Sequence, residues 1–558
     1  MESKISRREF AKTGTLATLG LLVGCSVRNQ FNIVIKNGMV LDGSGSQAIR
    51  KDLGIIGTKI VAIDDLSTAT SDQIIDADGL IIAPGFIDIH THTDIELIVN
   101  PMAESKICQG VTTEVAGNCG ASPFPLNDED FSEMDKNVLE SYDLHITWKD
   151  INGFLQVLNE KKISINYATF TGHGRLRSYI IGKNDIQPTP EQLERMKQSL
   201  VQSMENGSFG LSTGLEYAPG SYASTEELIE LCKVVSKYNG VYATHMRNED
   251  DRVEEAIQEA LHICKETDTP LQISHFKACN QSNWHKVDSM LETIHNAVES
   301  GMPVTVDRYP YIAYGTGLTT FLPLWSRQGS TDEILARLQD KSLLSKIQEY
   351  AESRGERIGG WDRVVISSCF SEKNKIWEGI TIQECATADS KSPFEFIRNL
   401  LLEERNRANI VGFAMNEDNL KKILSSSSVM IGSDGSAVAP YGKLSEGKPH
   451  PRYYGTFPRV LGKYCREEKL FDLATAIKKM TSMPAKKLGL QKRGIIQEGY
   501  YADITIFNPQ TVIDNATFIE PHQFPTGIEY VIVNGKVTVK NGKHTEERAG
   551  KVIRHNLT

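Results

Sequence analysis

Short apolar segments alternate with amphipathic stretches over the middle of the chain, from residue 86 to residue 434. The clearest unit starts at Ser224, where Glu227 three positions later predicts a capping box at the start of a helix. Apolar residues then recur at helical spacing until Gly240 ends the predicted helix, and 241–244 follow as a β-rich run. This alternation of helix and strand predicts a parallel sheet with crossover helices.

The same pattern predicts eight strands, the number that closes an α/β barrel of the TIM-like (β/α)8 type. They are expected near residues 86–90, 111–117, 164–171, 208–213, 241–245, 271–275, 303–308 and 428–434. The stretch between the last two strands is too long for an ordinary loop. We therefore expect an insertion over residues 315–410, with a helical pattern at 331–353 and a β-like run at 363–369.

Both ends of the chain are rich in short β-like runs and turn residues. Ile33–Ile35 precede an Asn-Gly pair at residues 37–38, and Tyr530–Val533 precede another at residues 534–535. We expect residues 31–84 and 490–558 to pair into one small β-sandwich domain, with the barrel over residues 85–489.

Composition and charge narrow the function classes. The 558 residues are 40% hydrophobic and 24% charged with 20 prolines, which is typical of a folded globular protein. The net charge of -10 and the lack of a long Lys/Arg block argue against a nucleic-acid partner. Nine cysteines without a framework spacing argue against a disulfide scaffold.

The first 25 residues are typical of an export signal. Paired Arg7 and Arg8 followed by Phe10 resemble a twin-arginine signal, and the uncharged run that follows is shorter than the ~20 residues that span a bilayer. Leu22 to Cys25 resemble a lipobox, at which bacterial lipoproteins are cleaved and acylated on the cysteine. We expect an exported protein that is lipid-anchored at Cys25 to a bacterial membrane, on the extracytoplasmic and periplasmic face.

Four histidines and an aspartate lie at the ends of four predicted strands. His90 and His92 are two residues apart at the end of the first strand, so their side chains point the same way. His245 closes the fifth strand, His275 the sixth and Asp434 the eighth. Because the carboxyl ends of barrel strands meet at one face, these side chains predict a metal site there.

Cys119 stands at the end of the second strand, in the run Gly117–Gly120. By composition alone a cysteine is more often a small core residue. Its place at a strand end favours a metal ligand instead. A two-metal site also needs a bridging anion, and this cysteine is a candidate for that role.

These motifs resemble the amidohydrolase superfamily and specifically the D-aminoacylase, or N-acyl-D-amino-acid deacylase, family. The resemblance is carried by Pro84–His92, Gln109–Gly120, Gly214–Tyr217, Thr244–Arg247, Ile273–His275, Gly432–Gly435, His450–Arg452 and Gly455–Arg459. It implies one or two Zn²⁺ ions, with His90, His92 and Asp434 as ligands of one. Cys119, His245 and His275 are implied as ligands of the other.

The resemblance also implies the chemistry. Zinc activates a water molecule, and Asp434 acts as general base and acid in cleaving the amide of an N-acyl-D-amino acid. Substrate-binding residues are implied at Arg452, Lys277, Tyr217 and Tyr309. Two alternatives stay open: a related amidohydrolase acting on a cyclic amide such as a hydantoin or on a dipeptide, and a metal-binding lipoprotein without activity.

Three further motifs carry competing interpretations. Ser212 lies in a Gly-x-Ser-x-Gly run, the pattern of a serine hydrolase nucleophile, but the residues after it read as a loop. Residues 442–448 match most of a phosphate-binding loop, but Pro449 stands where a hydroxyl is needed, so nucleotide binding is not supported. His173, also at a strand end, is equally compatible with a structural and a functional role.

Overall fold

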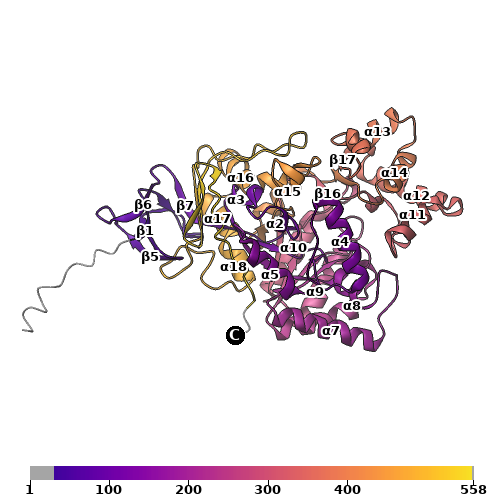
Figure 1. Ribbon diagram of the computed structural model, residues 1–558, viewed down its shortest axis with the longest axis horizontal. Helices are drawn as coiled ribbons and strands as arrows, with labels where there is room; N and C mark the ends of the chain where they lie inside the picture. The colour runs from indigo at the N-terminus through magenta and orange to yellow at the C-terminus, as the bar shows by residue number, and fades with distance from the viewer. Residues whose placement is uncertain (1–30, 556–558) are drawn as a thin grey trace, which may run out of the picture.

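The computed structural model describes residues 31–555, so the export signal and Cys25 lie outside the described residues. Figure 1 shows an elongated molecule: small sheets at one end, a barrel in the middle and a helical lobe at the other end. Within the described part of the chain, no helix combines the length and apolar character needed to cross a membrane.

The central barrel contains a strand that overlaps each of the eight predicted segments, which confirms the predicted fold class. Its strands are β8 (Phe86–Asp88), β9 (Val111–Ala116), β10 (Asn166–Thr169), β11 (Thr171–Gly172), β12 (Gly210–Gly214), β13 (Val241–His245), β14 (Leu271–Ile273), β15 (Val304–Arg308) and β19 (Val429–Ile431). Neighbouring strands are parallel, and β10 and β11 share the third position, divided at Phe170. A parallel bridge between Thr91 and Gly435 closes the ring between the first and last strands.

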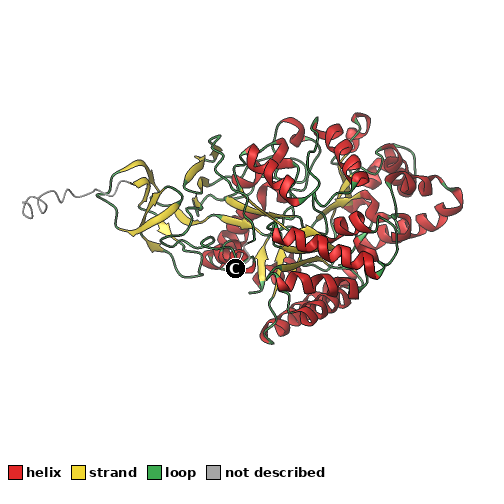
Figure 2. Cartoon of the chain, turned by 60° about the horizontal axis from the view of Figure 1, so that its bottom comes forward, coloured by secondary structure: helices red, strands yellow, loops and turns green. Residues whose placement is uncertain are grey.

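Helices surround the barrel and are sparse around the small sheets, as Figure 2 shows. Apart from the helices of the lobe described below, those between barrel strands are α2 (Glu96–Val99), α3 (Glu104–Ile107), α4 (Asp128–Tyr142), α5 (Ile151–Lys161), α6 (His173–Ile180), α7 (Pro190–Glu205), α8 (Thr225–Lys237), α9 (Val253–Thr267), α10 (Val287–Glu299) and α15 (Glu417–Ser425). After β19 come α16 (Arg452–Arg459), a π-helix (Val460–Glu467), α17 (Leu473–Met480) and α18 (Ser482–Lys487).

Helix α8 shows where the predicted capping box is wrong. The Ser224 side chain accepts from the Glu227 backbone N–H, as predicted. The Glu227 side chain does not accept from the Ser224 backbone N–H, as a full capping box requires. Its carboxylate instead binds the buried side chains of His173 and Arg177. The buried imidazole and guanidinium therefore outcompete the local cap.

The inside of the barrel is packed with apolar side chains, so it is a core and not a channel. Ile87, Val115, Ala168, Ala243 and Met430 belong to one cluster and are at most 1% exposed. The side chains that continue past this core at the carboxyl ends of the strands form the floor of the site described below.

Two sheets form the end of the molecule that contains Phe31. One has the order β5 (Lys59–Asp64), β4 (Asp52–Ile56), β1 (Phe31–Lys36) and β6 (Ser71–Asp76). The other has the order β23 (Lys543–His544), β22 (Lys536–Lys540), β21 (Ile528–Val533), β20 (Ile504–Phe507), β7 (Ile81–Pro84), β2 (Met39–Val40) and β3 (Ile49–Arg50). Strands from both ends of the chain meet where β20 pairs with β7, residue Ile504 opposite Pro84.

The segment between the last two barrel strands forms the lobe at the other end. It contains the sheet β16 (Tyr314–Gly317), β18 (Asn409–Gly412) and β17 (Val364–Ser368), with helices α11 (Thr331–Gln339), α12 (Lys341–Ile358), α13 (Ile382–Ala388) and α14 (Pro393–Glu403). The stretch 331–353, which was expected to be helical, forms two helices, α11 and α12. Asp340 separates them, because its side chain caps the second by accepting from the Ser342 N–H.

Candidate metal centre and active site

A cavity of about 820 Å³ opens at the carboxyl ends of the barrel strands. Nine of the ten site residues expected from the sequence line it: His92, Cys119, His245, His275 and Asp434 as candidate ligands, and Tyr217, Lys277, Tyr309 and Arg452 as candidate substrate contacts. The tenth, His90, is fully buried and contacts Cys119 and Asp434. The tertiary structure thus brings all ten to one place.

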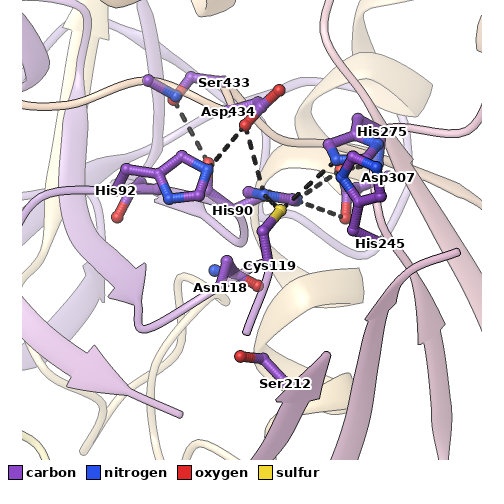
Figure 3. Close-up of polar contacts among 12 residues, drawn as sticks. His90, His92, Asn118, Cys119, Ser212, His245, His275, Asp307, Ser433 and Asp434 are labelled. Carbon is purple, nitrogen blue, oxygen red and sulfur yellow. Dashed lines mark hydrogen bonds and ion pairs between the residues drawn. The ribbon is translucent and has the colours of Figure 1, made fainter. Parts of the chain in front are cut away.

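Four of the candidate donors form one tight group, drawn in Figure 3. The Cys119 Sγ lies 3.4 Å from His90 Nε2 and 3.5 Å from His275 Nε2. The Asp434 Oδ1 lies 3.4 Å from His90 Nε2. Donors about 2.1 Å from a tetrahedral zinc ion are roughly 3.4 Å apart, so these spacings fit one ion.

His245 and His92 flank this group. The His245 ring lies 4.5 Å from the His275 ring, centroid to centroid, and both of its buried nitrogens lack a hydrogen-bond partner. An unpartnered buried imidazole is costly unless something coordinates it, so this residue fits a metal ligand. On the other side, His92 Nε2 lies 2.9 Å from Asp434 Oδ1.

The position of Cys119 differs from the simple division of ligands that the resemblance implies. That division groups the thiol with His245 and His275 alone, whereas the structure also places it against His90. Cys119 therefore lies between the two sets of donors, where one thiolate can reach two ions.

Neighbouring charges hold the two anionic donors in their ionised forms. Burial raises the pKa of the Cys119 thiol, but the imidazoles of His90 and His275 outweigh burial and hold that pKa well below 9.0. Burial also raises the pKa of Asp434, but the Arg452 guanidinium, followed by His275, holds it well below its usual range. A thiolate and a carboxylate are the forms that bind metal.

Two carboxylates that the sequence analysis missed lie behind the histidines. Asp307 Oδ1 lies 3.2 Å from His90 Nδ1, and Glu249 Oε1 lies 2.8 Å from His275 Nδ1. Both contacts leave the Nε2 atom of each histidine facing Cys119. Asp307 is the next-to-last residue of the mostly apolar strand β15, a position similar to the one that identified Asp434, so the sequence could have indicated it.

Three candidate ligands have left-handed backbones, which non-glycine residues rarely adopt. The φ angles of Cys119, His275 and Asp434 are 52°, 36° and 51°. Hydrogen bonds hold two of them, since the His275 N–H donates to Asp307 at 2.7 Å and the Asp434 N–H donates to the His90 carbonyl at 2.8 Å. Strained residues of this kind cluster at functional sites.

Cationic and phenolic groups face the same cavity. Arg452 forms an ion pair with Asp434 at 2.9 Å, and its Nε has no hydrogen-bond partner. Lys277 Nζ lies 2.7 Å from Glu249 Oε1. The buried Tyr309 hydroxyl has no partner either, while the Tyr217 hydroxyl lies 3.3 Å from Thr316 Oγ1. These groups can receive the carboxylate of a small molecule.

Two other candidate residues take structural positions. His173 is fully buried, does not line the cavity, and binds Glu227 through Nε2 at 2.8 Å. Ser212 is also fully buried and bonds to backbone atoms of the 117–120 loop. No helix directly follows its strand, so the strand, turn and helix of a serine nucleophile are missing here.

Comparisons with known proteins show which family the chain resembles over most of its length. The model of the amidohydrolase family matches residues 73–313 and 387–539, which leaves out most of the lobe between β15 and β19. D-aminoacylase from Alcaligenes xylosoxydans xylosoxydans is 35% identical over 94% of this chain and 97% of its own.

Solved structures show the same relationship. N-acyl-D-glutamate deacylase from Bordetella bronchiseptica, complexed with zinc and a phosphonate mimic of the tetrahedral intermediate, is 31% identical with a TM-score of 0.80, covering 94% of this chain and 100% of its own. A D-aminoacylase with a binuclear metal centre is 33% identical with a TM-score of 0.79, at the same coverage. A D-hydantoinase at 17% identity and a TM-score of 0.53 shares the fold alone.

The match over almost the whole chain is to deacylases, and the donors in the cavity are those of a zinc site. The chain is therefore a zinc-dependent enzyme that belongs to the amidohydrolase family, in the group of D-aminoacylase and the N-acyl-D-amino-acid deacylases.

Proposed function

We propose that this protein hydrolyses the amide bond of N-acyl-D-amino acids and releases a carboxylate and a free D-amino acid. The observation that carries the proposal is the place of Asp434, which contacts the metal donors His90 and His92 on one side and the Arg452 guanidinium on the other. A proton-accepting carboxylate thus lies directly beside a group that can bind the carboxylate of an amino acid.

The side chains divide the work of the reaction. Arg452 grips the substrate carboxylate, Lys277 adds a second positive charge, and Tyr309 donates a hydrogen bond from its unpartnered hydroxyl. These contacts place the acyl amide over the donors on the cavity floor. His90, His92, Cys119, His245, His275 and Asp434 are the residues that hold zinc.

Asp434 carries the proton. Bound zinc supplies the activation of a water molecule and the polarisation of the scissile carbonyl. Asp434, kept ionised by Arg452, accepts the proton of that water and delivers it to the nitrogen of the departing amine. Protonation is required because an amine leaves an amide readily only when it is protonated.

Amine release from paired N-acetyl-D- and N-acetyl-L-amino acids tests the proposal. The protein is assayed as purified, after removal of metal with a chelator, and after zinc is restored. We expect D-selective turnover that disappears with the metal and returns with zinc. Zinc-loaded protein that turns over neither enantiomer contradicts the proposal, and turnover of a hydantoin or a dipeptide in the same assay would assign the site to another substrate.

We also propose that the mature enzyme is exported and attached by lipid at Cys25 to the periplasmic face of a bacterial membrane. The support is the sequence of residues 6–25, with its paired arginines and lipobox. Ser26 after the cysteine lacks the aspartate of an inner-membrane retention signal, which favours the outer membrane.

Metabolic labelling with a radioactive fatty acid tests this attachment. We expect label in the membrane fraction for the full chain and none for Cys25→Ala. Arg7 and Arg8 changed together to lysine should leave the precursor in the cytoplasm. Unlabelled, soluble full-length protein would contradict lipid anchoring without touching the proposed activity.

A further inference from the structure

The loop that carries Cys119 has an unusual backbone. Gly117, Cys119 and Gly120 have φ angles of 70°, 52° and 74°, so three of its four residues are left-handed. For Gly117 and Gly120 this conformation costs little free energy because glycine has no Cβ, but for Cys119 it is strained. Something outside the loop must therefore hold the cysteine in place.

Neighbouring strands approach the loop too closely for side chains. A Cβ on Gly117 would lie 2.3 Å from the Phe170 carbonyl oxygen, and a Cβ on Gly214 would lie 2.1 Å from the Cys119 carbonyl oxygen. The second glycine of the Gly-x-Ser-x-Gly run is thus required by the cysteine loop.

The serine of that run ties the two ends of the loop together. The Ser212 hydroxyl donates to the Gly117 carbonyl at 2.5 Å and accepts from the Gly120 N–H at 3.1 Å. It is fully buried in β12, and Figure 3 shows it below Asn118 and Cys119. One hydroxyl therefore bridges residues on both sides of the thiol.

We propose that Ser212 is a positioning residue of the zinc site, which fixes the loop so that the Cys119 thiolate faces His90 and His275. A hydroxyl can both donate to the carbonyl and accept from the N–H, whereas the methyl group of alanine can do neither. Alanine leaves both backbone groups buried without a partner, so the loop can relax from its left-handed conformation and move the sulfur. The inference depends on the zinc site and is independent of which amide the enzyme cleaves.

Metal binding to the chelator-treated full chain tests the proposal with two matched variants. Ser212→Ala removes the hydroxyl that binds the loop. Thr213→Val removes the next hydroxyl of the same strand, which is also fully buried but donates to Thr244 Oγ1 at 2.7 Å and does not touch the loop. For each protein, zinc affinity is measured by competition, and Co²⁺ is added to record the thiolate-to-cobalt charge-transfer absorption.

We expect S212A to bind zinc roughly 10- to 100-fold more weakly and to lose intensity in the charge-transfer band, as when supports of metal ligands are removed. T213V should match the unaltered protein in both measurements. An unchanged affinity and spectrum in S212A, or equal losses in S212A and T213V, would overturn the proposal.

Ser212→Thr keeps the test decisive if S212A does not fold. This variant retains the hydroxyl, so we expect zinc affinity and the cobalt spectrum of the unaltered protein. Folded S212T that has lost the charge-transfer band would also overturn the proposal.

Discussion

The carboxylate of Asp307 lies behind the ring of His90, with Oδ1 3.2 Å from Nδ1, on the opposite side from the Cys119 thiol. Asp307 can accept a proton carried by Nδ1, and the tautomer with its proton there offers the lone pair of Nε2 to a metal. Because Asp307 also accepts the His275 N–H, one carboxylate orients two ligands from different strands.

Asp307→Asn should weaken zinc binding. An amide can present its NH₂ group to His90 and no longer favours the required tautomer, so we expect a roughly 10- to 100-fold loss in zinc affinity, measured by competition with a chelator. Asp514→Asn is the matched control, since Asp514 accepts from Tyr311 and Arg459 away from the metal donors. Equal affinities in the two variants would show that Asp307 does not orient the ligand.

Arg452→Lys should raise KM more than it lowers kcat. Lysine keeps the positive charge beside Asp434 but loses the two-pronged grip on a carboxylate. A charge-assisted hydrogen bond contributes about 1.5–3 kcal/mol, so KM for an N-acetyl-D-amino acid should rise roughly 10- to 100-fold.

The control for this change is in the same helix. Arg459 ends α16 and pairs with Asp514, outside the cavity. Arg459→Lys should leave KM unchanged. A KM for R452K equal to that of R459K would remove Arg452 from substrate binding.

Cys119 should become reactive when metal is removed. Its pKa is held well below 9.0 because nearby imidazoles outweigh burial, whereas burial raises the pKa of Cys108 and Cys369 to about 12. In chelator-treated protein at pH 6, iodoacetamide followed by peptide mapping should label Cys119 first, because the thiolate is the nucleophile. Restored zinc should protect Cys119 from labelling. Equal labelling of Cys119 with and without zinc would argue against ligation by this thiol.

Glu114→Gln should change how stability depends on pH. Burial is the main reason that the pKa of Glu114 rises from 4.5 to about 8 in the folded chain, and its Oε2 has no hydrogen-bond partner. Between pH 4.5 and 8 the folded chain keeps a proton that the unfolded chain has lost. The free energy of unfolding therefore falls as pH rises through this window, by up to about 1.4 kcal/mol per pH unit.

Urea unfolding at pH 5 and pH 7.5 measures this effect. E114Q has no such proton, so its stability relative to the unaltered protein should increase from the lower to the higher pH. Glu160→Gln, at an exposed position of α5, should show no such trend. A constant difference between E114Q and the unaltered protein would mean that Glu114 is ionised in the folded chain.

The sequence by itself determined the barrel and the side chains at its mouth. Strand period and helix spacing are local, so the segments ending at His92, His245 and His275 could be placed without knowing their neighbours. Parallel strands then bring their carboxyl ends to one face, which is why the candidate ligands meet in one cavity. Export and attachment at Cys25 stay predictions from sequence.

Only the tertiary structure decided which of these groups touch. Asp307 and His90 are 217 positions apart, and Ser212 and Gly117 are 95 apart, so their contacts depend on strand register and closure of the ring. The same holds for Glu227, whose carboxylate leaves its local cap for His173. The local sequence pattern determines which strand end a side chain occupies. Long-range packing determines which partner orients that side chain, and the partner in turn determines its chemistry.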